Sequence, residues 1–157
     1  MIESRHANYV LTELRRDSRD AALAPGIDPA VVSNTKSHTK VLSLDDTVLK
    51  GSFYVESVWI WAGRADIYPE TAEPNAHAHG YDETIAFFGT DFDNPNDLCG
   101  EIEFWMEDEK LILIRSCLIF VPKGMYHCPL VIHRVDKPIF HFATGTGSVY
   151  MQETTVT

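Results

Sequence analysis

The sequence predicts a single all-β domain with an N-terminal extension. Three observations support this prediction: an alternating pattern over residues 51–61, an apolar run over residues 112–121, and turn signals between such segments. A length of 157 residues suits one domain that buries its own core. We expect residues 1–39 to form the extension, or arm, and residues 40–157 to form the domain.

The clearest strand of the first half covers residues 51–61. Its period of two puts Trp59 and Trp61 on one face and Tyr54 and Glu56 on the other. Neither face is strictly polar, which indicates a sheet that is covered on both sides, as in a two-layer sandwich. The other expected strands cover residues 40–44, 84–89, 101–106, 129–133 and 138–144. One more expected strand covers residues 111–114, and the apolar run continues from it to residue 121.

The extension contains a charged stretch, residues 15–20, that we expect to lie on the solvated surface. Residues 24–29 combine Pro and Gly in a pattern that is typical of a loop. We expect such an arm to pack across its own domain or across a partner subunit, and a flexible tail is the alternative.

The overall charge and the cysteine content narrow the classes of partner and location. The net charge is −10, from 13 basic and 23 acidic residues, which disfavours binding to nucleic acid and to anionic membranes. No apolar stretch is long enough to span a bilayer. The N-terminus lacks a secretory pattern and three cysteines form no disulfide framework, so we expect a cytoplasmic protein.

Three histidines and one glutamate have spacings that are compatible with a metal site. His77 and His79 are two residues apart, so on a strand both imidazoles project from one face. Glu83 can return on the next strand, and the Pro-Lys-Gly sequence at 122–124 predicts a tight turn directly before His127. Three imidazoles and one carboxylate suit a divalent transition metal, and ordinary residues of a polar surface turn are the alternative.

The strand that begins near Glu83 predicts one wall of a substrate pocket. With a period of two, Glu83, Ile85 and Phe87 share a face, so two apolar side chains lie beside the expected metal. Trp59 and Trp61 are further candidates for the pocket, and a position in the core or in a subunit interface is the alternative.

Cys128 directly follows the expected ligand His127. Neighbouring side chains of an extended strand point to opposite faces, so we expect the Cys128 thiol to lie in the core and not at the metal. A ligating imidazole normally uses its second nitrogen to contact an acceptor, and the sequence identifies no such acceptor.

The two segments around these ligands resemble the two motifs of the cupin superfamily. The resemblance covers roughly residues 50–145 and implies the double-stranded β-helix, or jelly-roll barrel, of a single-domain cupin, since only one His-x-His sequence occurs. The matching positions are His77, His79, Glu83, Pro122, Gly124 and His127, and the departing positions, which are turn and packing positions, are Thr71, Gly89, Ser116 and Val131.

The resemblance implies a metal site and a small-molecule ligand, but it does not select one reaction. We expect one divalent transition metal per chain, iron first, with manganese, nickel, zinc or copper as alternatives. The first hypothesis is an iron-dependent dioxygenase for a small enol, phenol or acid. The second is a non-redox lyase, isomerase or decarboxylase in which Glu83, Tyr126 or His141 moves a proton. The third is a non-catalytic binding protein. Exposed sheet edges of a half-open sandwich also predict a homodimer.

Overall fold

The computed structural model describes residues 5–28, 30, 35–63 and 75–153, so Thr71 lies outside the described residues. No described helix has the length and apolar character needed to cross a membrane. Two short 3₁₀ helices, Ala7–Tyr9 and Ser18–Ala22, precede the strands. The described strands are β1 (His38–Leu44), β2 (Val55–Ile60), β3 (Glu83–Gly89), β4 (Asp97–Met106), β5 (Glu109–Arg115), β6 (Cys117–Val121), β7 (His127–Val135) and β8 (Ile139–Gly145).

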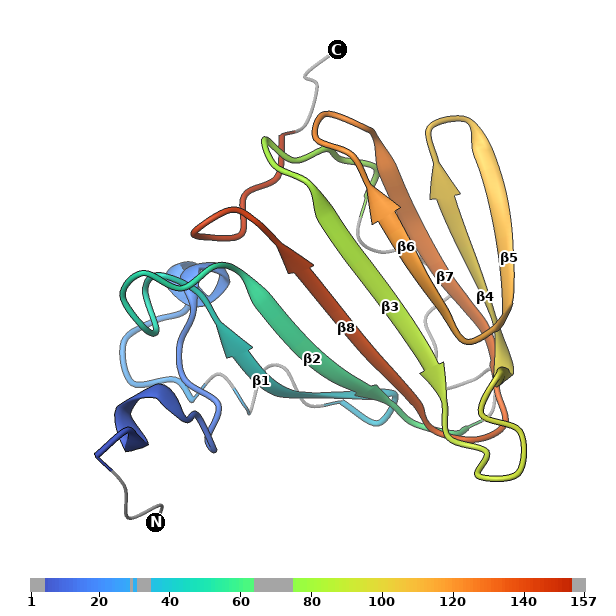
Figure 1. Cartoon of the computed structure of the whole chain (residues 1–157), viewed down its shortest axis with the longest axis horizontal. Coiled ribbons are helices and arrows are strands. Elements are labelled where there is room, and N and C mark those ends of the chain that lie inside the picture. Colours follow the sequence, from blue (N-terminus) through green and yellow to red (C-terminus); the bar gives the residue numbers. More distant parts are fainter. Residues whose placement is uncertain (1–4, 29, 31–34, 64–74, 154–157) are drawn as a thin grey trace.

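The strands form two antiparallel sheets, which confirms the all-β prediction. One sheet has the order β1-β2-β8-β3-β6 and the other has the order β5-β4-β7. Figure 1 shows that β8, from the end of the chain, lies between β2 and β3. Among the described strands, no ladder joins the two sheets into a closed barrel.

The core lies between the two sheets because each strand turns every second side chain inward. In β4 the buried positions are Leu98, Gly100, Ile102 and Phe104, in strict alternation with partly exposed ones. These side chains pack with buried residues of the larger sheet, among them Phe87. Each large apolar side chain buried in this way contributes about 2 kcal/mol to the free energy of folding.

The N-terminal extension packs on its own domain, so the prediction that residues 15–20 are solvated is wrong. Asp17 and Asp20 are only 6% and 7% exposed. Asp17 caps the helix Ser18–Ala22 and lies 2.7 Å from the Nζ of Lys40 on β1. The backbone N–H of Ser18 donates to Asp45, at 2.8 Å. The charged stretch is buried because its carboxylates find a cation and backbone donors there.

Candidate metal centre

Backbone hydrogen bonds hold the segments of the expected ligands together. His77 and His127 exchange two backbone hydrogen bonds, of 3.0 and 2.9 Å. The N–H of Gly124 donates to the carbonyl of His79, at 2.9 Å. Gly124 has a φ of 80°, and Met125 N–H donates to the Pro122 carbonyl at 3.0 Å. The tight turn that the sequence predicts before His127 therefore exists, and it fixes the two halves of the site against each other.

Each of the three imidazoles donates its Nδ1–H to a backbone carbonyl. His77 contacts the carbonyl of Asn75 at 2.6 Å, and His79 contacts that of Met151 at 2.5 Å. His127 contacts the carbonyl of Met125 at 3.2 Å. These contacts orient the rings and leave every Nε2 with a free lone pair in the neutral imidazole. They are the acceptors that the sequence could not identify.

The Nε2 atoms of His79 and His127 face one carboxylate oxygen of Glu83. The distances to Oε2 are 3.3 Å from His79 and 3.1 Å from His127, and the ligand atoms of all three residues lie within 4.8 Å of one another. His79 Nε2 and Glu83 Oε2 are buried and have no hydrogen-bond partner among the described residues. Buried acceptors that face one another need a proton or a metal cation between them, and two imidazoles with a carboxylate can hold a divalent metal ion.

Electrostatics at this centre favour positive charge. Burial by itself raises the pKa of Glu83, and the facing imidazoles of His127 and His79 outweigh it and lower that pKa to about 2. Burial lowers the pKa of His79, and contacts with Glu83 and with the Met151 carbonyl outweigh it, so that this pKa lies above its usual value. The carboxylate is therefore ionised at neutral pH, and a divalent cation would supply the charge that the centre attracts.

His77 lies beside His79 and His127, with ring centroids 4.9 and 4.4 Å from theirs, but its ligand atom does not belong to the group that contains Glu83. Its Nε2 lies 3.4 Å from the hydroxyl of Tyr150, which can donate to it. Its nearest group of candidate ligands is the set His77, His127 and Cys128, whose ligand atoms also lie within 4.8 Å of one another. Cys128 lies in the core, as expected, but the expectation that its thiol points away from the ligands is wrong. Cys128 has a φ of 68°, and this left-handed backbone interrupts the alternation of the strand.

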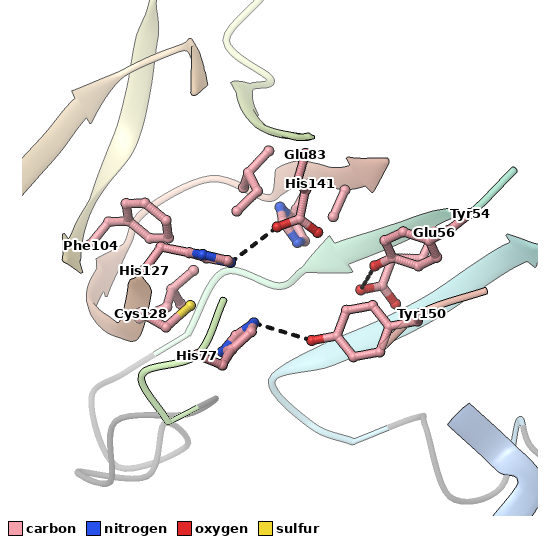
Figure 2. A pocket seen from close by; sticks show the side chains of 12 residues that line it. Tyr54, Glu56, His77, Glu83, Phe104, His127, Cys128, His141 and Tyr150 are labelled. Atoms are coloured by element: carbon pink, nitrogen blue, oxygen red, sulfur yellow. Dashed lines mark hydrogen bonds and ion pairs between the residues drawn. The ribbon is translucent and has the colours of Figure 1, made fainter. Parts of the chain in front are cut away.

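A cavity of about 90 Å³ lies beside these ligands. Figure 2 shows that Glu83 and His127 face it from one side and Tyr54, Glu56 and Tyr150 from the other. The residues that line it are Tyr54, Glu56, His77, Glu83, Ile85, Phe104, His127, Cys128, Leu130, His141, Ala143 and Tyr150.

Of the four residues predicted for the pocket, Ile85 alone lines this cavity. Phe87 shares the inward face of β3, but it is fully buried deeper in the core and stacks on His141 at 4.6 Å between ring centroids. Trp59 and Trp61 lie on the outer face of the larger sheet, where their rings stack at 5.8 Å. The tryptophans point outward because side chains of β2 alternate between its two faces: Glu56 points toward the cavity, so Trp59, three residues later, points away from it.

The two expected proton-transfer residues besides Glu83 have different environments. His141 lines the cavity and donates its Nδ1–H to the carbonyl of Ala86 at 2.9 Å. Burial lowers the pKa of His141, so the imidazole is neutral at pH 7 and has a free Nε2. Tyr126 does not line the cavity. Its carbonyl accepts from the Glu107 N–H at 2.8 Å, and its own N–H donates to the Glu107 carboxylate at 3.1 Å.

A polar cluster that the sequence did not predict lies on the opposite wall of the cavity. The Tyr54 hydroxyl donates to Glu56 at 3.1 Å, and Arg19 of the extension pairs with Glu56 at 2.5 Å. The guanidinium of Arg19 lies over the rings of Tyr54 and Tyr150, at 5.2 and 5.1 Å from their centroids. One sequence feature indicated this cluster: Glu56 lies on the inward face of its strand, and a carboxylate that faces a core needs a partner.

Tyr81 supports the ring of His79 from outside the ligand set. The two rings are nearly parallel, with centroids 5.0 Å apart. A Cβ atom on Gly147 would lie 2.4 Å from the Tyr81 ring, so only glycine leaves room for this ring.

No family model and no curated protein sequence matches this chain. Solved structures do match it, and one of oxalate oxidase in complex with glycolate has a TM-score of 0.50 and 10% identity, over 93% of this chain and 63% of that one. The chain has the cupin fold.

Two other matches have lower TM-scores. A structure of oxalate decarboxylase has a TM-score of 0.48 and 14% identity, over 77% of this chain and 29% of that one. The DMSP lyase DddQ from Ruegeria pomeroyi DSS-3 has a TM-score of 0.37 and 24% identity, over 64% of this chain and 41% of that one. The chain thus spans between 29% and 63% of these three structures, and the likeness concerns the cupin fold alone.

Proposed function

We propose that this cupin is a metal-dependent enzyme that acts on a small oxygenated organic molecule. The supporting observation is that Nε2 of His79, Nε2 of His127 and Oε2 of Glu83 face one another, and that His79 Nε2 and Glu83 Oε2 are buried without a hydrogen-bond partner among the described residues. This set lies beside a cavity, so a bound ion would be accessible to a substrate. The ligand set would also include His77 if its imidazole releases the Tyr150 hydroxyl.

The size and lining of the cavity support a small substrate. Its volume of about 90 Å³ is far below the roughly 300–1,000 Å³ that is typical of pockets for drug-sized ligands. Ile85, Phe104 and Leu130 provide apolar surface, while Glu56 and His141 provide polar contacts. A molecule with a short carbon skeleton and one or two oxygen atoms fits this combination.

The first candidate reaction is iron-dependent dioxygenation of a small enol, phenol or acid. A bound iron(II) ion supplies redox chemistry with dioxygen, whereas bound manganese, nickel or zinc supplies Lewis acidity. Glu83 is ionised and offsets part of the charge of a divalent ion. The imidazoles of His79 and His127 are held by backbone carbonyls, and Ile85 excludes water from the same wall.

The second candidate is a non-redox lyase, isomerase or decarboxylase, and the cavity wall gives a specific reason for it. His141 is neutral and its Nε2 can accept a proton. Burial opposes the ionisation of Glu56, but the charge and hydrogen bond of Arg19 outweigh it and lower its pKa. His141 is therefore a group that can take a proton in the cavity that the metal ligands also line, whereas the ion pair with Arg19 makes Glu56 a weaker base.

Metal content and the need for dioxygen test these candidates together. Elemental mass spectrometry on untagged protein purified without chelators should give about one transition-metal ion per chain. With iron, consumption of dioxygen in the presence of small enols, phenols or acids supports the oxygenase. Turnover under anaerobic conditions with manganese, nickel or zinc supports the non-redox enzyme. Ligand stabilisation without turnover would leave a binding protein, and no metal after reconstitution would overturn the proposal.

The homodimer and the cytoplasmic location stay predictions within this proposal. The outer face of the larger sheet supports the homodimer, because Leu118 and Phe120 are 64% and 60% exposed on it. A dimer that covers this face would leave the cavity, which lies between the sheets, open to substrate.

A further inference from the structure

A thiol lies among the candidate ligands of this cupin. Cys128 lines the cavity and is 5% exposed, and its sulfur belongs to a group with His77 and His127. Figure 2 shows the sulfur beside the rings of His77 and His127. The positive φ of Cys128 lets two consecutive residues, His127 and Cys128, line the same cavity.

The candidate ligands form two overlapping sets that share His127. The first set, His79, Glu83 and His127, offers two nitrogens and one oxygen. The second set, His77, His127 and Cys128, offers two nitrogens and one sulfur. All five side chains are 5% exposed or less, and His79 Nε2 and Glu83 Oε2 are buried acceptors without a hydrogen-bond partner. A thiolate is a soft ligand and a carboxylate is a hard one, so the two sets favour different ions.

We propose that Cys128 is a metal ligand, which with His77 and His127 forms a second, sulfur-containing set for soft and borderline divalent cations. This inference rests on the proposed metal centre, since both sets use His127. On binding, the S–H bond of Cys128 breaks, the proton passes to water, and a metal–sulfur bond forms. The centre then accepts cations such as Zn²⁺, Co²⁺ and Cd²⁺ through sulfur, while Mn²⁺ is bound through the set that contains Glu83.

Cobalt(II) tests this proposal without any assay of activity. Metal-free full-length protein is titrated with Co²⁺ under anaerobic conditions, and a cobalt–thiolate bond gives a charge-transfer band in the near ultraviolet. We expect this band in the native protein and in the control Cys117→Ser, and its loss in Cys128→Ser and Cys128→Ala. The visible ligand-field bands of cobalt should remain in both Cys128 variants, because His79, Glu83 and His127 still bind the ion.

The possible results distinguish the two proposals. A near-ultraviolet band that survives in both Cys128 variants, or that is absent from native protein with bound cobalt, would overturn the role of Cys128. Absence of every cobalt band and of bound cobalt in native protein would instead overturn the metal centre itself. Calorimetry gives a second measure: Cys128→Ser should weaken Cd²⁺ binding by at least about tenfold and change Mn²⁺ binding by less than about twofold. Equal losses of affinity for Cd²⁺ and Mn²⁺ in Cys128→Ser would also contradict the proposal.

Discussion

Arg19 of the N-terminal extension forms an ion pair with Glu56 on the wall of the cavity, with Nη2 and Oε2 2.5 Å apart. The side chain of Arg19 is 24% exposed and that of Glu56 is 16% exposed, so the pair is largely shielded from water. Asp17 also contacts the guanidinium, at 3.2 Å. The extension thus supplies the cation that keeps a cavity carboxylate ionised, and it belongs to the structure of the site.

Replacing Arg19 by Met should destabilise the protein by about 3 kcal/mol, because it leaves the buried carboxylate of Glu56 without its partner. Urea unfolding measures this loss. The double variant Arg19→Met/Glu56→Gln should lose less than Arg19→Met alone, since no unpaired charge remains. Lys50→Met is the matched control: Lys50 also pairs with an aspartate, but its side chain is 89% exposed, so the unfolding curve should not change. Equal losses in Arg19→Met and Lys50→Met would contradict the structural role of the pair.

Replacing His79 by Ala should lower the metal content of the purified protein to less than about a tenth of the native value. His79 Nε2 faces Glu83 at 3.3 Å, and its removal leaves one imidazole and one carboxylate in that set. His133→Ala is the control, because His133 is an exposed histidine of β7 that pairs with Glu103 on the neighbouring strand β4, within the smaller sheet. Elemental mass spectrometry on both variants measures the effect. Full metal content in His79→Ala, or a large loss in His133→Ala, would mean that the wrong histidines were identified.

The sequence could predict the strands and the cluster of ligand residues because both follow from local spacing. His77 and His79 lie two apart and His127 follows a Pro-Lys-Gly turn, and backbone hydrogen bonds join these segments in the structure. The sequence could also predict that Ile85 shares the face of Glu83, because side chains two residues apart on a strand point to the same side.

The remaining features depend on geometry that local spacing does not encode. The position of Cys128 depends on a left-handed backbone at a residue other than glycine, which no sequence pattern announces. The pairing of Arg19 with Glu56 joins residues that are 37 positions apart, so a charged stretch was mistaken for a solvated one. Trp59 and Trp61 were candidates for the pocket, but both faces of β2 carry apolar residues, and only the sheet pairing reveals which face is inside.

Acid should destabilise the protein through Asp17. Burial raises the pKa of Asp17, but the hydrogen bond from Lys40 and the charge of Arg19 outweigh it and lower that pKa from 3.8 to about 2. Because the folded-state pKa is depressed, this contribution of about 2 kcal/mol is present above pH 4 and is lost as the pH falls from about 4 to about 2.

Urea unfolding at several pH values between about 6 and 2.5 measures this contribution as the difference between native protein and Asp17→Asn. The difference should be largest near neutral pH and should shrink through the acid range. Asp108→Asn, in the exposed turn between β4 and β5, is the control and should follow the native curve at every pH. If the difference in unfolding free energy between native protein and Asp17→Asn does not depend on pH, the ion pair with Lys40 is not the cause of the acid destabilisation.

A homodimer should form through the outer face of the larger sheet. The outward positions of β3, β6 and β8 hold no charged residue, in a chain whose net charge is −10. Two copies can therefore bring these faces together without repulsion between like charges, and doing so covers exposed apolar side chains. The residues of this outer apolar face are Phe88, Leu118, Phe120, Phe140 and Phe142.

Light scattering coupled to size exclusion should give twice the mass of 17.7 kDa for the native protein. Leu118→Lys/Phe120→Lys should give the monomer mass, because it puts charges into the centre of the contact. Ile114→Lys is the matched control, since Ile114 is 54% exposed on β5 of the other sheet, and it should leave the dimer intact. A native protein with the monomer mass would contradict the dimer prediction. If the dimer survives in Leu118→Lys/Phe120→Lys but dissociates in Ile114→Lys, the contact lies on the smaller sheet.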